Sequence, residues 1–570
     1  MVEHETTMML AAKRMTAMLG RWWQRPLALP GGERGAPALL VILAVALLAQ
    51  VVLVDGLAMA GFVVGRPIGA GTFFLGTALA LGLAVTLVHR QRDRLAARTA
   101  YAGLALLVAA VVAMTVLTGL VYDVSWDGQG YHLPAIIRLA SGWNPVTEPL
   151  PADAEAPVPL AYYPKATWLY GAALAAATGS LEASKAVNLV LALAAALLLL
   201  AVVARGESPP TRGRLVIVAI AAANPVVTKQ LMTHYVDGAL GSSLLALAAA
   251  LLLTRERRDW AALTALALAL MVLATVKQTG PVFGVLLVGG FLGWRAWRRR
   301  PWRRPAMVAA LALALGVGAL GYHPYVQNAL ATGNPIYPFD GSGAAMDRQR
   351  PANLHGANRL TKLAYGLFGE ARYRQGAPAE LKFPLWISPG EVVAMAAVDT
   401  RVGGFGPLSG LVALVALAYA ATLRRQRPDK GMVVIAGLFL ISGVLFPEPW
   451  WTRFVPQLWL VPGFLLLAVP PQPKNRGRAW LGAALVALMA FNALASWGAN
   501  AGLIALRNVE LRRGLSTLAA LGRPVAVAAY FPETTKARLG ERGIPYRLVA
   551  EVHCGRPIRL VKTIACPTER

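Results

Sequence analysis

The sequence predicts an all-α polytopic membrane protein with about thirteen transmembrane helices and a small external α/β domain at its C-terminal end. The 570-residue chain is 56% hydrophobic and only 15% charged, whereas soluble domains carry about 25% charged residues. Apolar runs long enough to cross a bilayer recur along most of the chain, and arginines gather in short clusters between them. These observations exclude a soluble enzyme, a disordered chain and a disulfide scaffold.

The positive charge of the chain is concentrated between the apolar runs. The formal net charge is +27, from 55 Lys and Arg against 28 Asp and Glu. Arginine clusters occur within 255–258, 298–304 and 424–427, and short basic loops of this kind mark the cytoplasmic side of membrane proteins. That side carries anionic lipids. We therefore expect membrane lipids, and no nucleic acid, as partners of these clusters.

The apolar runs also define the expected domains. Residues 1–36 form a basic cytoplasmic segment, residues 37–498 the membrane domain, and residues 499–570 an external domain. With the N-terminus inside, the segments 122–183 and 322–403 are external and the short basic loops cytoplasmic. This predicts a multi-pass protein of the bacterial inner membrane with a periplasmic C-terminal domain. The expected spans are 37–63, 70–88, 101–121, 184–204, 214–228, 238–254, 260–276, 281–294, 305–321, 404–423, 431–446, 453–469 and 479–498.

Residues 164–178 are apolar enough to be a fourteenth span. Counting them as a span would place every later basic loop outside, against the charge rule. We therefore expect an in-plane or re-entrant helix on the external surface.

The C-terminal region 499–570 has a different pattern. Runs at 524–531, 545–552 and 557–565 are strand-like, with a short helical pattern after the first. This is typical of a small α/β domain.

The composition of this region suggests a role. It holds twelve Lys or Arg against five Asp or Glu, so its surface would attract anionic lipid headgroups or acidic glycans and guide an acceptor. A solvated cap on the last helix is the alternative. The chain's two cysteines, Cys554 and Cys566, lie here and form either a disulfide or two free thiols.

A loop that only connects two spans does not require an acidic residue directly after the first span. The third span is followed by the run Tyr122-Asp-Val-Ser-Trp-Asp-Gly-Gln-Gly-Tyr-His-Leu-Pro. Asp127 in this run would lie at the membrane surface, where it could act as a general base. Asp123 is the rival candidate. Both could instead cap the following helix or stay hydrated.

Five motifs resemble those of one family. The run from Trp126 to Pro134 (WDGQGYHLP) is similar to the first-loop motif of the GT-C membrane glycosyltransferases, in the bacterial group of aminoarabinose transferases and protein O-mannosyltransferases. The resemblance extends over residues 100–460 and identifies no sugar. Later motifs that resemble this group, in the same order, are Tyr162-Tyr-Pro-Lys, Tyr235-Val-Asp-Gly-Ala-Leu, Val276-Lys-Gln-Thr-Gly and Asn328 to Phe339 (NALATGNPIYPF).

The resemblance implies a glycosyltransferase, either a hexosyl- or a pentosyltransferase. Such enzymes move a sugar from a polyprenyl-phosphate donor to a lipid, glycan or protein acceptor of the cell envelope on the external face of the membrane. The first-loop acid takes the proton of the acceptor hydroxyl, which assigns the catalytic role to Asp127. The phosphate needs cationic groups and the polyprenyl tail an apolar groove. Substrate-binding positions are expected at Tyr131, His132, Tyr163, Lys165, Asp237, Lys277 and Arg453.

The charged candidates have alternative interpretations. Lys165, Lys277 and Arg453 fall at external membrane edges, where they either hold the lipid phosphate or only snorkel to the interface. Asp237 could orient an acceptor, bind a metal with His234, pair with Lys277 or cap its helix.

No cofactor is assigned from the sequence. His132 and His323 could join a divalent-metal site, but no ligand spacing is specific, and members of the family differ in metal use. The sequence therefore leaves open whether the protein binds a divalent metal ion.

Two other protein classes share parts of this pattern. A transporter or flippase of lipid-linked sugars would also be polytopic, but it would place ionisable residues inside the spans, where this sequence has few. An O-antigen-ligase-like polymerase would use a similar donor and carry a large external loop rich in Arg and His. The 322–403 segment does hold Arg348, Arg350, His355, Arg359, Arg372 and Arg374.

Overall fold

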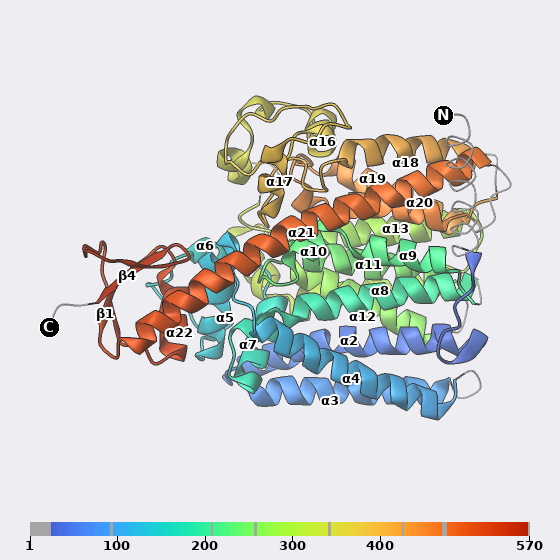
Figure 1. Cartoon of the computed structure of the whole chain (residues 1–570). Coiled ribbons are helices and arrows are strands. Elements are labelled where there is room, and N and C mark those ends of the chain that lie inside the picture. The colour runs from blue at the N-terminus through green and yellow to red at the C-terminus, as the bar shows by residue number, and fades with distance from the viewer. Residues whose placement is uncertain are drawn as a thin grey trace, which may run out of the picture.

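Most of the apolar runs fold into helices that lie side by side along one direction (Figure 1). About 69% of the computed structural model is helical, and each predicted span overlaps a helix. The structure describes residues 24–91, 95–206, 209–255, 259–339, 344–424, 427–469 and 476–567. Most of the predicted basic segment 1–36 therefore lies outside the described residues. The bundle helices are α2 (Gly32–Val63), α3 (Ala70–Arg90), α4 (Ala97–Gly119), α8 (Ala186–Gly206), α9 (Arg212–Ala222), α11 (Asp237–Leu253), α12 (Trp260–Val276), α13 (Gly280–Trp297), α14 (Arg303–Leu315), α18 (Ser409–Leu423), α19 (Lys430–Leu445), α20 (Leu460–Leu467) and α21 (Arg476–Ala520).

The centre of the bundle consists of helices that are apolar on every side. All residues of α11 are buried; α8 and α12 pack against it, and α2 packs against both. A helix that is apolar all round needs neighbours on all its faces. The outer helices α3 and α4 instead expose large apolar side chains such as Leu75 and Leu106. Asp237, the first residue of α11, therefore begins the most enclosed helix of the bundle.

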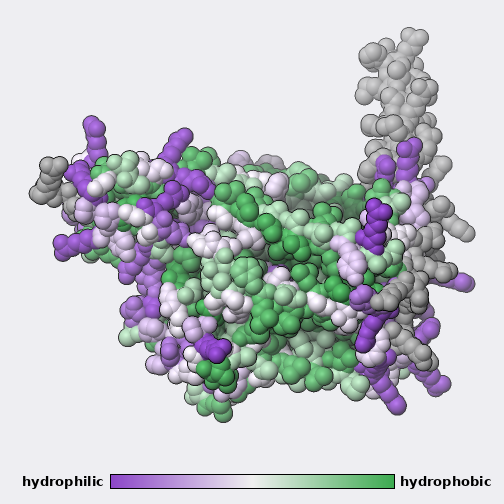
Figure 2. All heavy atoms as spheres, turned by 90° about the horizontal axis from the view of Figure 1, so that it is seen from below, coloured by the Kyte–Doolittle hydropathy of each residue, from purple (hydrophilic) through white to green (hydrophobic). Residues whose placement is uncertain are grey.

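The face of the molecule shown in Figure 2 is mostly apolar over its middle and more polar toward its two ends. Six helices of the described residues are long and apolar enough to cross a membrane; they coincide with or include α2, α3, α4, α8, α14 and α21. The apolar helices α11, α12, α18 and α19 are shorter. These features agree with the expected multi-pass membrane protein. The number of spans stays a prediction.

The segments predicted to be external fold into short helices rather than spans. The residues 164–178 that could have formed a fourteenth span contain α7 (Ala166–Thr178), whose 13 residues measure roughly 20 Å, too short for the ~30 Å apolar core of a bilayer. It packs against α2, α3 and α5 at the end of the bundle that carries α22 (Figure 1). The other short helices are α5 (Leu133–Ala140), α6 (Pro157–Tyr162), α10 (Pro225–Gln230), α15 (Gln327–Thr332), α16 (Arg359–Phe368), α17 (Pro389–Ala396) and α22 (Pro532–Glu541).

The last bundle helix is longer than predicted. The expected span ends at residue 498, but α21 continues for 45 residues to Ala520, which corresponds to roughly 68 Å. The helix crosses the expected domain boundary at residue 499 and carries the C-terminal sheet beyond the end of the bundle (Figure 1). The first strong stop signal is Gly522, with φ +58°, followed by Pro524. A glycine in the left-handed region with a proline close behind is a common helix end.

The C-terminal module is a small four-stranded sheet with one helix. Its strand order is β2-β1-β4-β3; β2 runs parallel to β1, and the other neighbours are antiparallel. The predicted strand 557–565 is in fact a hairpin, because the chain turns at Lys562, which has φ +57°. Cys554 and Cys566 form a disulfide. The strands are β1 (Val525–Ala529), β2 (Tyr546–Leu548), β3 (Ile558–Leu560) and β4 (Thr563–Pro567).

Candidate active site

A cavity of about 210 Å³ lies where α11 begins and α12 ends. Its wall combines segments that are far apart in the sequence: the first external loop, the residues before α7, the junction of α12 and α13, and the stretch after α19. Seven of the eight predicted site residues line it, namely Asp127, Tyr131, His132, Tyr163, Asp237, Lys277 and Arg453.

The first-loop motif places Asp127 at the edge of this cavity. A Cβ atom on Gly128 would lie 2.0 Å from Asp123 Oδ2, so only glycine permits the close turn that follows Asp127. The backbone N–H of Asp127 donates to Tyr235 Oη at 3.2 Å, and Tyr131 Oη donates to Asp127 Oδ2 at 3.2 Å. Tyr235 thus holds the backbone of Asp127 and Tyr131 its carboxylate, while the side chain remains 17% exposed.

Arg453 is the centre of charge in the cavity. Its Nη1 lies 3.0 Å from Asp127 Oδ2, 3.8 Å from Asp237 Oδ2 and 3.6 Å from Asp399 Oδ1. The guanidinium carbon lies 4.1 Å from the centre of the Trp451 ring, a cation–π distance. Three carboxylates therefore share one cation, and a bound anion would compete with them for it.

Asp399 is a site residue that the sequence did not reveal. It comes from the long external segment between α17 and α18, where it is one polar residue among many. Among the described residues its buried Oδ1 has no hydrogen-bond partner. Burial raises the pKa of Asp399 to about 6, and the nearby charge of Arg453 opposes that rise. The neighbouring Thr400 is fixed by Lys229, whose Nζ donates to Thr400 Oγ1 at 2.9 Å.

Lys277 and Asp237 form an ion pair across the ends of α12 and α11. This was one of the alternatives predicted for Asp237, which also accepts from Gln230 Nε2 at 3.2 Å. Lys277 Nζ lies 4.3 Å from the centre of the Phe454 ring. The turn after Lys277 needs a glycine, because a Cβ on Gly280 would lie 1.8 Å from the Leu273 carbonyl oxygen.

Three of the sequence motifs are joined by hydrogen bonds next to Lys277. Gln278 Nε2 donates to the carbonyls of Tyr162 and Tyr337 at 3.0 and 3.3 Å. Asn328 Nδ2 donates to the same two carbonyls, each at 3.3 Å. The Tyr162, Val276 and Asn328 motifs are thus tied together by two amide side chains. They form a scaffold that sets the position of the α12–α13 junction.

The remaining predicted residues have mainly buried partners. His132 Nδ1 accepts from Trp168 Nε1 at 2.8 Å, and burial lowers the pKa of His132 to about 3, so the ring is a neutral part of the wall. Lys165 is only 3% exposed and is not among the described residues that line the cavity. Its Nζ donates to the Tyr163 carbonyl at 3.1 Å.

Asp123, the rival first-loop acid, is fully enclosed. Its Oδ2 accepts from His234 N and lies 2.8 Å from His234 Nδ1, while Oδ1 accepts from the N–H of Ser125. Burial acts to raise the pKa of Asp123, but the hydrogen bond and charge of His234 outweigh it and hold that pKa well below its ordinary value. This carboxylate has no surface on which to receive a proton from a substrate.

His234 completes a buried Asp123–His234–Ser184 chain, because its Nε2 lies 2.8 Å from Ser184 Oγ. This order of residues matches that of hydrolase triads. Ser184 Oγ, however, donates to the Leu181 carbonyl at 2.5 Å and is 1% exposed. This hydrogen-bonded series is therefore structural, and Ser184 is not a nucleophile. His234 is also unavailable to bind a metal together with Asp237.

The described residues contain no group of three or more His, Cys, Asp or Glu side chains arranged to hold a metal ion. His323, one of the histidines considered for such a site, is buried and its Nδ1 has no hydrogen-bond partner in the described part of the chain.

The C-terminal module packs directly on the first external loop. Thr534 Oγ1 in α22 donates to the Gln129 carbonyl at 2.7 Å. The rings of Phe531 and Trp126 meet edge to face at 5.4 Å, and Lys562 Nζ lies 3.9 Å from the centre of the Trp126 ring. Because Trp126 directly precedes Asp127, the module lies beside the candidate active site.

Comparisons with known proteins give one similarity in structure. Neither a family model nor a curated protein matches the chain. Among solved structures it is similar to ArnT from Cupriavidus metallidurans, crystallised bound to undecaprenyl phosphate, with a TM-score of 0.44, 14% sequence identity, and coverage of 79% of this chain and 86% of that chain. At this TM-score the similarity does not assign a function.

Proposed function

We propose that this protein is a membrane glycosyltransferase of GT-C type that moves a sugar from a polyprenyl-phosphate donor to a cell-envelope acceptor on the external face of the membrane. The observation that carries the proposal is the meeting of Asp127, Arg453 and Lys277 in one cavity at the end of an apolar bundle. A carboxylate for proton transfer and two cations for a phosphate are the groups that this reaction needs.

The reaction follows from these groups. The acceptor hydroxyl oxygen attacks the anomeric carbon of the donor sugar and gives its proton to the carboxylate of Asp127. The bond between that carbon and the phosphate oxygen breaks, and the electron pair leaves with the polyprenyl phosphate, so the configuration at the carbon inverts. Arg453 and Lys277 neutralise the departing phosphate. When the phosphate binds, it takes over contacts that Arg453 makes with the three carboxylates, which frees Asp127 to accept the proton.

The size of the cavity favours a small transferred group. Its volume of about 210 Å³ is below the ~300–1,000 Å³ of sites for drug-sized ligands. It suits one sugar-phosphate unit, with the polyprenyl tail in the surrounding membrane, better than a whole glycan.

Two of the six Arg and His residues noted in the 322–403 segment, Arg350 and Arg372, are engaged in ion pairs and do not support the ligase-like alternative. Arg350 is buried and pairs with Glu448 at 2.7 Å, and Arg372 pairs with Glu370 and Glu380. These side chains hold the loop together instead of facing the cavity.

One observation keeps the transporter alternative testable. Asp55 lies inside the long apolar helix α2, is 1% exposed, and its Oδ1 has no hydrogen-bond partner among the described residues. Buried carboxyl groups within spans often mark transport pathways. Replacing Asp55 with Asn should leave sugar transfer unchanged if the protein is a transferase, whereas a transporter would lose movement of the lipid-linked sugar.

The decisive experiment is transfer by the purified protein with lipid donors that carry one sugar or an oligosaccharide. Transfer from the single-sugar donor, accompanied by glycolipid mass changes in cells with and without the protein, is expected. Transfer of whole glycans only, or a topology map that places residue 127 on the cytoplasmic side, would end the proposal.

A further inference from the structure

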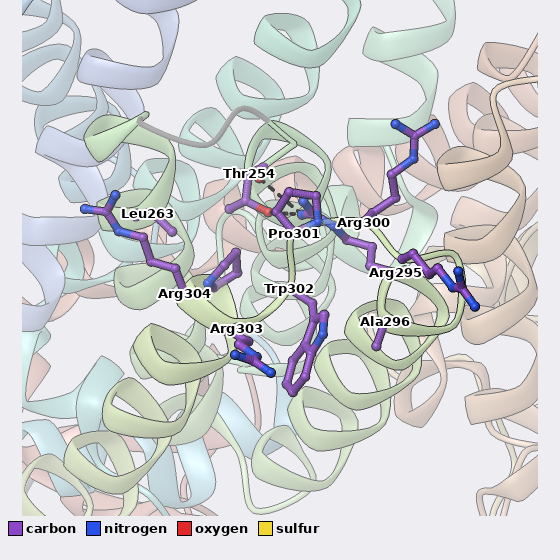
Figure 3. Close-up of a pocket in the computed structure, with 11 residues that line it drawn as sticks. Thr254, Leu263, Arg295, Ala296, Arg300, Pro301, Trp302, Arg303 and Arg304 are labelled. Atoms are coloured by element: carbon purple, nitrogen blue, oxygen red, sulfur yellow. Dashed lines mark hydrogen bonds between the residues drawn. The ribbon is translucent and has the colours of Figure 1, made fainter.

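A second hollow, of about 610 Å³, lies at the opposite end of the central helices from the candidate active site. Figure 3 shows the residues that line it. Thr254 directly after α11, Leu263 in α12, the end of α13 and the start of α14 form its wall. The candidate site lies at the other ends of α11, α12 and α13. Each of these helices has 17 or 18 residues, so the two hollows are separated by roughly 25 Å.

The floor of this hollow is a buried cation. Arg295 is 3% exposed, and its Nη1 donates to the Thr254 carbonyl and Oγ1 at 3.1 and 3.2 Å (Figure 3). No carboxylate of the described residues pairs with it; the charges that act on it are those of Arg255 and Arg300, which repel it. The positive charges of Arg295, Arg255 and Arg300 thus act together on this hollow, and such a grouping attracts an anion.

The rim of the hollow is built from arginines on a shaped turn. Arg299 has φ +52°, an uncommon conformation for a residue with a side chain. The turn is closed by hydrogen bonds from Arg299 N to the Ala296 carbonyl at 2.9 Å and from Arg300 N to the Arg295 carbonyl at 2.8 Å. Among the described residues, the lining includes no acidic side chain. The rim cations are Arg299, Arg300, Arg303 and Arg304.

Next to the hollow, α14 exposes a continuous apolar stripe. Met307, Leu311 and Leu315 are 68%, 62% and 42% exposed, and their spacing of four residues places them on one face of the helix. Trp302, at the edge of the hollow, is 39% exposed, as expected of an aromatic residue at a membrane interface. A ligand with a charged head and an apolar tail would match both surfaces at once.

We propose that this hollow binds the phosphate group of an anionic phospholipid, with an acyl chain of that lipid along Met307, Leu311 and Leu315. A free phosphate has the same charge chemistry but gains nothing from the stripe. With the orientation expected from the basic loops, the lipid belongs to the cytoplasmic leaflet.

The test is lipid retention by the full-length protein in neutral detergent, followed by native mass spectrometry. The probes are dioctanoyl phosphatidylglycerol, dioctanoyl phosphatidylcholine and inorganic phosphate. The variant Arg299→Gln with Arg300→Gln removes two rim charges. Its matched control, Arg298→Gln with Arg424→Gln, removes two charges from exposed arginines at the ends of α13 and α18 that do not line the hollow.

Phosphatidylglycerol should bind in preference to phosphatidylcholine, and the rim variant should weaken this binding roughly 10- to 30-fold, since each arginine near anionic lipid contributes ~1 kcal/mol. The control pair, and Arg299→Lys with Arg300→Lys, should retain most of the binding. Leu311→Gln should weaken lipid binding as well. Equal losses in the rim and control variants, or equal retention of both lipids, would overturn the site. If inorganic phosphate binds as tightly as phosphatidylglycerol and Leu311→Gln does not weaken its binding, the hollow is a site for free phosphate and not for a phospholipid.

Discussion

The guanidinium of Arg538 donates to Glu182 Oε1 from Nη2 and Nε, at 2.7 and 3.2 Å, across 356 positions of sequence. It also donates to the Asp123 carbonyl at 2.6 Å and to Gln129 Oε1 at 2.9 Å. One side chain of the C-terminal module therefore connects the start and the end of the first external segment, on either side of Asp127. We consequently expect the module to be part of the catalytic unit and not a separable appendage.

Replacing Arg538 with Gln should destabilise the protein and reduce sugar transfer together. Both Arg538 and Glu182 are buried, and removing one partner of a buried ion pair costs roughly 3–5 kcal/mol. Thermal unfolding of the detergent-solubilised protein measures the first effect and transfer kinetics the second. Arg547→Gln, an exposed charge in β2, is the control. If both variants unfold at the wild-type temperature, the module does not stabilise the loop.

Replacing Asp127 with Asn should lower sugar transfer by roughly 10²–10⁴-fold, because Asn keeps the shape of the side chain but cannot accept the proton. Donor binding and thermal stability should stay close to those of the wild type, since Arg453 retains Asp237 and Asp399 as partners. Steady-state transfer and binding of the polyprenyl-phosphate donor separate the two effects.

The other acids of the site provide the comparison. Asp123→Asn should chiefly destabilise, because Asp123 is fully buried and bonded to His234. If Asp127→Asn remains active while Asp237→Asn or Asp399→Asn is inactive in a stable protein, the base belongs to that residue and the assignment to Asp127 is wrong.

The sequence motifs predicted much of this site because they lie at helix ends. Asp127 directly precedes the helical turn Gly128–His132, Asp237 is the first residue of α11, and Lys277 directly follows α12. Helix ends on one side of a bundle gather together once the topology is known. Of the alternatives considered for Asp237, the pairing with Lys277 is present in the structure. A role in phosphate binding for Lys165 stays a prediction, although its burial between Trp143 and Trp168 places the ammonium away from the cavity.

Asp399 and Arg538 could not be predicted for a physical reason. Asp399 lies in a stretch without hydrophobic periodicity, and Arg538 lies in a short helix whose pattern does not reveal its buried face. Each acquires its partners only through long-range packing. The length of α21 was missed because hydropathy reports where a helix leaves the membrane and not where it ends. Its helical pattern continues after residue 498 with polar residues such as Arg507 and Glu510, and the stop signal comes only at Gly522.

Arg453 should be essential for binding the donor phosphate. Arg453→Gln leaves Asp127, Asp237 and Asp399 close together without their shared cation, so both donor affinity and stability should fall. Arg453→Lys should restore stability in part but bind the donor less well, since a lysine cannot make bidentate contacts with a phosphate. Because the guanidinium occupies the space between the carboxylates, we expect chelators to leave transfer unchanged. Activity lost with a chelator and restored by a divalent ion would show that a metal is required.

Asp399 should make the stability of the protein depend on pH between about 4 and 7. Its pKa is raised from 3.8 to about 6, so the folded protein binds this proton more tightly than the unfolded chain does. The contribution of Asp399 to stability is therefore complete below its unfolded pKa and is lost as the pH rises through about 6. Asp399→Asn should gain roughly 2–3 kcal/mol relative to the wild type between pH 4 and pH 8. Unfolding temperatures across this pH range measure the effect, with the exposed Glu551→Gln as control. Parallel curves for the wild type and Asp399→Asn would contradict it.

The basic surface of the C-terminal module should guide the acceptor. An open hollow of about 610 Å³ on the sheet is lined by two cations, Arg559 and Lys562, and one acid, Glu510. Lys562 lies against Trp126, next to Asp127 in the chain. An acceptor with phosphate or carboxylate groups would thus be attracted to a surface that adjoins the base. Replacing both cations with Gln should raise the KM for the native acceptor several-fold at low ionic strength, and the difference should shrink as salt screens the charges.

Point variants are preferable to truncation here, because removing the chain after residue 500 would also remove half of α21 and the Arg538 contacts. Hydrolysis of the donor without acceptor should proceed at the wild-type rate in the Arg559→Gln, Lys562→Gln variant, since neither side chain lines the cavity that holds Asp127. The matched control replaces Arg547 and Arg556, which are exposed in the same module and do not line its hollow. If the control raises the acceptor KM as much as the test variant does, the effect comes from net charge alone. If neither does, the module serves only as a cap that stabilises the end of α21.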